Sequence, residues 1–462
     1  MAVRRDLTQG SVGKNITNQS LGMMVGMLSM VGYNLVDTFF VGKLGTSQLA
    51  AMSFTFPVSM AANSIALGLG VGGAAVISRA VGSKNHDEVK RLTTNSLYLG
   101  LIVVAVIMVT GFTTMDLVFT SLGARGEILV MIKEYMTVWY WGMPFVVIPM
   151  IGSNAIRAAG NTLLPSMVMM GSMIMNAVLD PLLIFGIGFF PRMELEGAAL
   201  ATVIARMTTF IASLYLLNYK FHMLSIVKPE IAELYDSWKR VLYIGFPAIL
   251  NQFIPQISMG VATRIISDYG KEAVAGFGVA TRIEMIAIGP LISFANTMIA
   301  YTGQNLGAKR IDRIEDGIKF VNKASLIIGA VMFAAFAIFG KYTSMIFNDD
   351  PTVINISYLY LAVVSVSYGV MGISMSASAT FSALHKPYSS IMINIIRMIV
   401  IFIPLLLIGN YTFQLPGIIV GITISIFLGT IISVLWLRKT IAQFKIHPDY
   451  SNQEPVPVEE IA

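Results

Sequence analysis

Long apolar stretches, separated by short polar loops, dominate this chain and limit what it can fold into. Each holds about 20 or more mainly apolar residues, enough for a helix to cross a hydrocarbon core of about 30 Å. Inside lipid, such stretches satisfy their backbone polar groups by forming helices. The twelve expected spans are 17–41, 50–78, 94–118, 128–156, 163–189, 195–219, 240–266, 274–303, 321–347, 354–382, 388–412 and 415–437. The sequence therefore predicts an all-α polytopic membrane protein.

The second half of the chain repeats the first at an offset of about 225 residues. Matching positions are Lys14 and Lys239, Gly45 and Gly270, Ala50 and Ala275, Gly82 and Gly307, and Asp87 and Asp312. Since each half holds an even number of spans, both halves enter and leave the membrane on the same side, which is a parallel repeat.

This repeat predicts two six-helix lobes joined by a linker. We expect an N-lobe over 1–219, a cytoplasmic linker over 220–239, a C-lobe over 240–437 and a cytoplasmic tail over 438–462. Pro229, followed by an acidic stretch, predicts a short interfacial helix within the linker.

The distribution of Lys and Arg predicts the orientation. If the N-terminus is cytoplasmic, that face carries 21 of the 31 basic residues, the other face carries eight, and Arg206 and Arg397 lie within spans. Cytoplasmic loops carry the excess of positive charge, so both termini are expected inside, in the inner (plasma) membrane of a prokaryote. The net charge of +6 follows from this loop bias, and no nucleic-acid partner is expected.

Several kinds of chemistry are excluded or disfavoured. The chain has no cysteine, so disulfides and thiolate metal sites are excluded, and its four histidines are scattered over loops and the tail. No Gly-x-x-x-x-Gly-Lys-Ser/Thr motif for ATP is present, and no pair of aspartate-rich motifs that could hold magnesium. We therefore expect no enzyme activity and no cofactor, and transport driven by an ion gradient remains.

Polar groups within the spans of the first half are the candidate ion site. Asp37 lies in span 1, Asn176 and Asp180 lie one helical turn apart on one face of span 5, and Thr202 lies in span 6. Pro181 removes a backbone donor and frees a carbonyl beside the Asp180 carboxylate. Together these groups could hold a proton or a sodium ion.

The ordinary alternative is structural. Asp37 could reach the outer interface, and Asp180 could cap or pair with a packing group. An acidic residue at a helix centre costs about 2.5–3.5 kcal/mol on insertion scales, so two at a similar depth favour a functional reading.

The same residues carry a resemblance to a known family. The motifs are Tyr33-Asn-Leu-Val-Asp37, Gly42-x-Leu-Gly45, Asn176-Ala-Val-Leu-Asp180-Pro181, Gly197-Ala-Ala-Leu-Ala-Thr202 and Gly303-Gln-Asn-Leu-Gly-Ala308. Over about residues 15–440, the chain resembles the multidrug and toxic compound extrusion (MATE) family, and its DinF-like branch most closely.

The resemblance implies a V-shaped pair of lobes that exports amphipathic, often cationic compounds in exchange for protons or sodium ions by alternating access. It also implies that Asp37, Asn176 and Asp180 form the coupling site. Two departures stand out. Span 1 reads Ser20-Leu-Gly22 where that branch often has a proline, and spans 7 and 10 lack the acids of the second-lobe cation site in other branches.

Arg206 lies one turn from Thr202 on the same helix face. It could pair with Asp37 or Asp180 and keep that carboxylate charged, or it could serve structure by reaching the interface or a backbone carbonyl. The expected substrate contacts are Tyr33, Tyr140, Asn154, Met173, Met175 and Arg206.

We predict a monomeric, ion-coupled multidrug exporter. The nearest alternative is a flippase for a lipid-linked precursor in the same superfamily. An intramembrane enzyme is a second alternative, and a passive channel is disfavoured because no ring of repeated pore-lining residues is evident.

Overall fold

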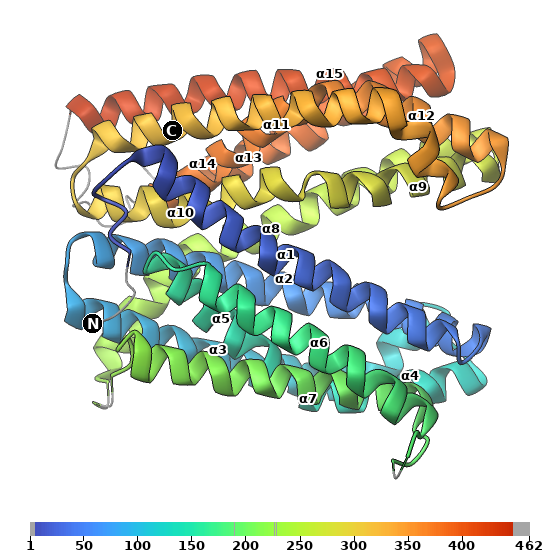
Figure 1. The fold of residues 1–462 in the computed structure, drawn as a ribbon, viewed down its shortest axis with the longest axis horizontal. Helices are drawn as coiled ribbons and strands as arrows, with labels where there is room; N and C mark the ends of the chain where they lie inside the picture. Colours follow the sequence, from blue (N-terminus) through green and yellow to red (C-terminus); the bar gives the residue numbers. More distant parts are fainter. Residues whose placement is uncertain (1–4, 189, 226, 228, 447–462) are drawn as a thin grey trace. The chain divides into compact units, whose positions relative to one another are not determined.

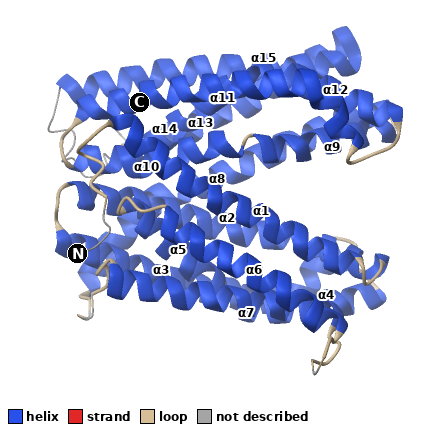
Figure 2. Cartoon of the chain, viewed as in Figure 1, coloured by secondary structure: helices blue, strands red, loops and turns tan. Residues whose placement is uncertain are grey.

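The structure of the chain is a computed structural model that describes residues 5–188, 190–225, 227 and 229–446. Helices make up nearly all of this part of the chain, and it contains no strand (Figure 2). The predicted all-α fold class is confirmed.

The chain divides into two compact units. Unit 1 contains Leu21–Ile77 and Asn85–Gly245, and unit 2 contains Asp6–Ser20, Ser78–Lys84 and the described residues from 246 onward. The first helix therefore begins within unit 2 and continues into unit 1.

The helices from the N-terminus to the end of unit 1 follow the expected spans closely (Figure 1). They are α1 (Val12–Gly42), α2 (Thr46–Gly82), α3 (His86–Ser121), α4 (Gly126–Trp141), α5 (Pro144–Ala158), α6 (Leu163–Phe185), α7 (Glu194–Tyr215), the π-helical turn η1 (Leu216–Lys220) and α8 (Ile231–Ile266), whose second half belongs to unit 2.

Unit 2 continues with helices that are more often broken. They are the 3₁₀ turn η2 (Ser267–Tyr269), α9 (Lys271–Ala287), α10 (Gly289–Gly307), α11 (Ile311–Met345), α12 (Pro351–Val364), the 3₁₀ turn η3 (Ser365–Ser367), α13 (Tyr368–Ala383), α14 (Pro387–Ile395), the π-helical turn η4 (Ile396–Ile401) and α15 (Phe402–Ile446).

Local sequence explains several helix ends. The side chain of Asn85 accepts a hydrogen bond from the Glu88 backbone N–H and so caps the start of α3. Asp350 does the same for Thr352 at the start of α12, where Pro351 takes the first helical position. Gly186 ends α6 in the left-handed conformation (φ 71°), which glycine adopts without steric cost.

Eight helices of the described chain are long and apolar enough to cross a membrane, or nine if α9 and α10, bent by 48°, count as one span. One of the eight, Pro387–Ile446, holds two expected spans, because Gln414 has non-helical torsion angles (φ 55°, ψ −140°) and breaks it. The pair α4–α5 and the helix α8 account for the two remaining expected spans.

The linker differs from the prediction of a short interfacial helix. Ile231 begins a helix of 36 residues that runs through to Ile266, so the linker helix and span 7 are one element. Its start is fastened to α3 within unit 1, since Asn95 donates to Ser237 Oγ at 2.9 Å and Arg240 pairs with Glu88 at 3.0 Å.

A segment before α1 is held by unit 2. The Arg313 guanidinium donates to the backbone oxygens of Gly10 at 2.9 Å, Leu7 at 3.2 Å and Gln9 at 3.3 Å, and to Asn305 Oδ1 at 3.1 Å. Leu7 is 1% exposed. One buried arginine therefore donates to three backbone oxygens of a segment that lies outside any helix.

Candidate functional site

Helices α6 and α7 lie side by side (Figure 1). They pack at backbone distance, which brings polar groups of the two helices close to each other. A Cβ added at Gly197 would lie 2.7 Å from the Leu183 backbone oxygen, so only glycine fits there. Further along, Ser172 Oγ donates to the Ala205 backbone oxygen at 2.8 Å. The small residues that follow Gly197 therefore bring Thr202 and Arg206 toward the polar face of α6.

Asp180 and Asn176 form a buried pair on α6. Asn176 Nδ2 donates to Asp180 Oδ1 at 2.9 Å, and both residues have no exposed surface. Pro181 lies inside the continuing helix, so the Ala177 carbonyl has no intrahelical donor. The same-face arrangement expected from the four-residue spacing is present.

Asp37 of α1 joins this pair. It is 7% exposed, and its charge interacts with that of Asp180. Three buried oxygens, Asp37 Oδ1, Asp180 Oδ2 and Asn176 Oδ1, accept no hydrogen bond from any described residue. We call Asp37, Asn176 and Asp180 the acidic cluster. Its free oxygens are all acceptors, which suits a bound proton or cation.

Tyr33 links the acidic cluster to α7. It lies one turn before Asp37 on α1, is 6% exposed, and interacts with Thr202, Asp37 and Asp180. The Arg206 guanidinium lies over the Tyr33 ring, 4.7 Å from its centroid. This is a cation–π contact.

Neither reading of the sequence named the contact of Arg206 with an aromatic ring. No described carboxylate lies within ion-pair distance of Arg206, and its role stays a prediction. Helical spacing placed Arg206 below Thr202, but the contact with Tyr33 depends on how α1 packs.

Tyr135 of α4 is a member that sequence reasoning missed. It is 5% exposed and close enough to Asp37, Asp180 and Tyr33 to interact with their charges. The only signal in the sequence was its position on the buried face of α4, which it shares with Ile132, Met136 and Tyr140.

Two of the expected substrate contacts, Tyr140 and Asn154, pack between neighbouring helices. Tyr140 is 4% exposed and packs edge-on against Phe112 with ring centroids 5.4 Å apart. Asn154 donates to the Met150 backbone oxygen at 2.8 Å and lies against Gly70. Neither is part of the acidic cluster, and their role in substrate binding stays a prediction.

The two methionines on α6 differ from each other. The Met173 sulfur lies against Gly32 of α1, where an added Cβ would approach it to 2.6 Å. Met175 is 37% exposed. A flexible thioether between α1 and α6 adapts to small shifts of either helix.

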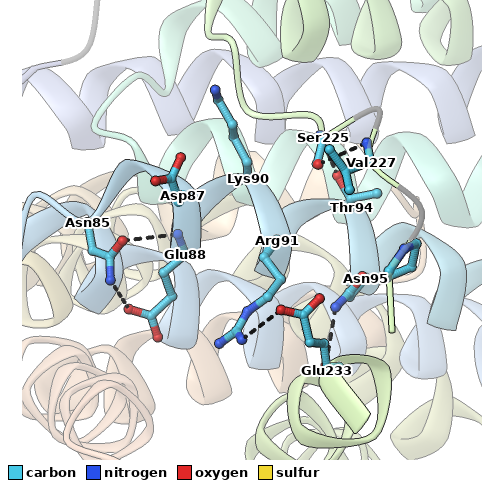
Figure 3. Close-up of a pocket in the computed structure, with 11 residues that line it drawn as sticks. Asn85, Asp87, Glu88, Lys90, Arg91, Thr94, Asn95, Ser225, Val227 and Glu233 are labelled. Carbon is cyan, nitrogen blue, oxygen red and sulfur yellow. Dashed lines mark hydrogen bonds and ion pairs between the residues drawn. The ribbon is translucent and has the colours of Figure 1, made fainter. Parts of the chain in front are cut away.

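Two cavities of the described residues lie away from the acidic cluster. One of about 610 Å³ in unit 1 lies at the start of α3 and beside Ser225, Val227 and Pro229 (Figure 3). Its lining carries charges of both signs, and some of them are paired: Arg91 lies 3.6 Å from Glu233, and Asn85 donates to Glu88. No group of three or more His, Asp or Glu side chains that could hold a metal ion occurs in the described part of the chain.

Comparison with known proteins decides the family. The MatE family model matches residues 23–182 and again residues 247–408, which together exceed half of the chain. The chain belongs to the MatE family. The two matched segments start 224 residues apart, in agreement with the internal repeat read from the sequence.

Relatives support the same assignment over nearly the whole length. A Shewanella oneidensis protein named FAD transporter is 33% identical over 425 residues, covering 92% of this chain and 94% of that protein. The multidrug export protein MepA of Staphylococcus saprophyticus is 30% identical, covering 90% and 91%. The crystal structure of the Vibrio cholerae MATE transporter VcmN in its bent form has a TM-score of 0.89 at 27% identity, covering 94% and 98%.

Membership in the MatE family settles the class of protein. The chain is a multi-pass membrane transporter for multidrug efflux and not an enzyme, its transport is ion-coupled, and it needs no cofactor. The flippase alternative is not favoured.

Proposed function

We propose that this MatE protein exports amphipathic organic compounds from the cell in exchange for protons, with Asp37 and Asp180 as the coupling carboxylates. The observation that carries the proposal is the acidic cluster, two buried acids with no described cationic partner. Burying such acids is costly, and they persist where they bind and release a positive charge. The name of the relative MepA supports multidrug compounds as substrates.

The hydrogen-bond inventory of the cluster favours a proton over a sodium ion. Asn176 uses its donor on Asp180 Oδ1, and three oxygens of the cluster accept no hydrogen bond from a described residue. One proton turns a carboxylate into a donor and removes one of two like charges. A sodium ion would instead draw on the same oxygens together with the Thr202 hydroxyl.

The distribution of charge supports an orientation with both termini cytoplasmic. The face assigned to the cytoplasm carries 21 of the 31 basic residues, as the positive-inside tendency requires. The acidic cluster comes from a single unit of one chain, so we propose that the monomer is functional.

Reconstitution in liposomes tests the proposal. Export of a fluorescent organic cation is measured under an imposed pH gradient and, separately, under an imposed sodium gradient. We expect export with the pH gradient alone, and none for Asp37→Asn or Asp180→Asn although both variants stay folded. Asp116→Asn is the matched control, because Asp116 is 70% exposed and pairs with Lys133. Export driven only by sodium would assign the cluster to that ion, and normal export by either cluster variant would overturn the assignment.

An anionic substrate is a second candidate. The relative at 33% identity is named FAD transporter, and Arg206 brings a positive charge beside the aromatic ring of Tyr33. A guanidinium next to an aromatic face suits a phosphate and a stacked ring system. Competition between FAD and the fluorescent cation in the same liposomes distinguishes an anionic from a cationic substrate. Export of FAD that is abolished by Arg206→Gln would favour FAD as the substrate.

A further inference from the structure

A groove in unit 2 carries a chemistry that ion-coupled export does not use. The cavity measures about 420 Å³ and is lined by residues of α11, α13 and α15. These helices are labelled in Figure 1. Glu315, Ile318, Lys319 and Asn322 follow one another at helical spacing along α11, so one face of that helix forms one wall. Lining residues from α13 and α15 are Ile373, Ala377, Val434, Leu437, Arg438, Ile441, Ala442 and Lys445.

The floor of the groove is apolar. Ala377, Leu437 and Ile441 are buried and belong to one hydrophobic cluster, against which Ile318 packs. Along α15 the lining runs from residue 434 to residue 445, a distance of about 17 Å at 1.5 Å per residue. A trough of this kind accommodates a hydrocarbon chain lying along the helix.

The rim of the groove is basic. Lys319, Arg438 and Lys445 line it together with one acid, Glu315, which pairs with Lys445 at 2.8 Å. Lys319 pairs with Asp316 at 3.5 Å, but both side chains are more than half exposed, so this pair is weak. Arg438 is exposed and has no acidic partner among the described residues. The rim therefore keeps positive charge that the protein does not neutralise.

The position of the rim fits a membrane surface. Lys319 lies in the third turn of α11, and Arg438 and Lys445 lie in the last three turns of α15, next to the loops that the charge count assigns to the cytoplasm. Basic pockets between transmembrane helices at this level attract the headgroups of anionic lipids. Exposed basic side chains over an apolar trough match both parts of such a lipid.

We propose that this groove binds an anionic glycerophospholipid of the cytoplasmic leaflet. Arg438 and Lys319 hold the headgroup phosphate, Asn322 offers an amide donor, and one acyl chain lies along Val434, Leu437 and Ile441. The cavity at the start of α3 lacks this combination, because Val227 and Pro229 are the only apolar residues of its described lining, and it therefore has no apolar trough. Its charged residues are of both signs (Figure 3).

Thiol protection tests the proposal, and the absence of cysteine from the chain makes it direct. Ala442→Cys places a thiol in the groove, and Gln443→Cys places one on the next residue, which is exposed but outside the lining. Each variant is placed in nanodiscs of phosphatidylcholine alone or with phosphatidylglycerol, and its reaction rate with a small maleimide is measured.

We expect phosphatidylglycerol to slow the reaction of the Ala442→Cys variant about fivefold or more, and to leave that of the Gln443→Cys variant unchanged. Adding Arg438→Ala and Lys319→Ala should each reduce the protection about fivefold, as removal of one basic residue near a lipid surface does. Lys439→Ala is the charge-matched control, because Lys439 is exposed on the same helix but does not line the groove.

Three results would overturn the proposal. Equal protection by both lipid mixtures would mean that no anionic headgroup is recognised. Protection by glycerol phosphate in phosphatidylcholine nanodiscs would assign the rim to a soluble anion. Protection that survives Arg438→Ala combined with Lys319→Ala would place the lipid elsewhere.

Discussion

Arg313→Ala should release the segment that precedes α1. In the structure this guanidinium reaches the backbone oxygens of Leu7, Gln9 and Gly10 at 2.9–3.3 Å. Removing it takes one donor from each of these oxygens; the Leu7 and Gln9 oxygens keep one other bond each, from Asn305 and Asn15. The lost bonds can be replaced only by bonds to water.

The magnitude follows from the three bonds. A hydrogen bond to a charged group contributes about 1.5–3 kcal/mol, and these three share one side chain and are replaced by bonds to water. Independent bonds would contribute about 4.5–9 kcal/mol together, and for these two reasons we take about 3 kcal/mol for the set, below that range. Since about 1.4 kcal/mol changes an equilibrium tenfold, the released state should become about 100 times more populated.

Labelling of a cysteine measures this release. Leu7 is 1% exposed, so a Leu7→Cys variant of the cysteine-free chain should react slowly with a thiol reagent while Arg313 is present. Where reclosing is faster than labelling, the rate follows the released population and should rise about 100-fold in the double variant.

Arg310→Ala is the matched control. Arg310 is half exposed and pairs with exposed Asp312 at 3.2 Å, so its loss should leave labelling of residue 7 unchanged. A rise of less than about threefold for Arg313→Ala would refute the reasoning, because the segment would then be held by its other contacts. The bonds from Leu7 N to Gln304 Oε1 at 3.0 Å and from Asn305 Nδ2 to the Leu7 oxygen at 3.3 Å would be the candidates.

Three further changes test the site. Gly197→Val should cost about 1–3 kcal/mol or more in thermal stability, because its Cβ alone would lie 2.7 Å from the Leu183 oxygen; an unchanged melting temperature in detergent would contradict the close packing. Pro181→Ala should supply the missing backbone donor and raise the melting temperature while slowing transport, and equal transport rates would show that the free carbonyl is not used. Arg206→Lys should weaken the contact with the Tyr33 ring by about 0.5–1 kcal/mol, measured as a loss of substrate affinity in a binding titration; unchanged affinity would leave the contact without a role in binding.

The spans could be predicted from the sequence, because a backbone inside lipid has few alternatives to a helix. The breaks within spans could not be predicted. Residues 128–156 read as one apolar span, whereas the structure ends α4 at Trp141 and starts α5 at Pro144. A proline is acceptable both at the first position of a helix and at a kink, so Pro144 alone does not distinguish the two. Gln414 is a similar case, because its left-handed torsion angles are unusual for glutamine.

The sequence predicted the part of the site that follows from spacing along a single helix. Asn176 and Asp180 share a face by their separation of four residues, and the structure joins them by a hydrogen bond. Which side chains from other helices face them depends on rotation of each helix about its axis. For that reason Tyr135 and the contact between Arg206 and Tyr33 were missed, since the sequence of a span that is apolar on all sides does not reveal its rotation.

The close packing of α6 against α7 also limits how unit 1 can work. Because Gly197 contacts the backbone of α6 directly, sliding of one helix along the other would make main-chain atoms clash. We therefore expect α6 and α7 to move as one rigid body. The contact between α1 and α6 at Gly32 is made by the end of the Met173 side chain, which can change rotamer. In the transport cycle proposed above, we therefore expect neutralisation of Asp37 to move α1 against a fixed α6–α7 pair. A cross-link between α6 and α7 should then leave transport intact.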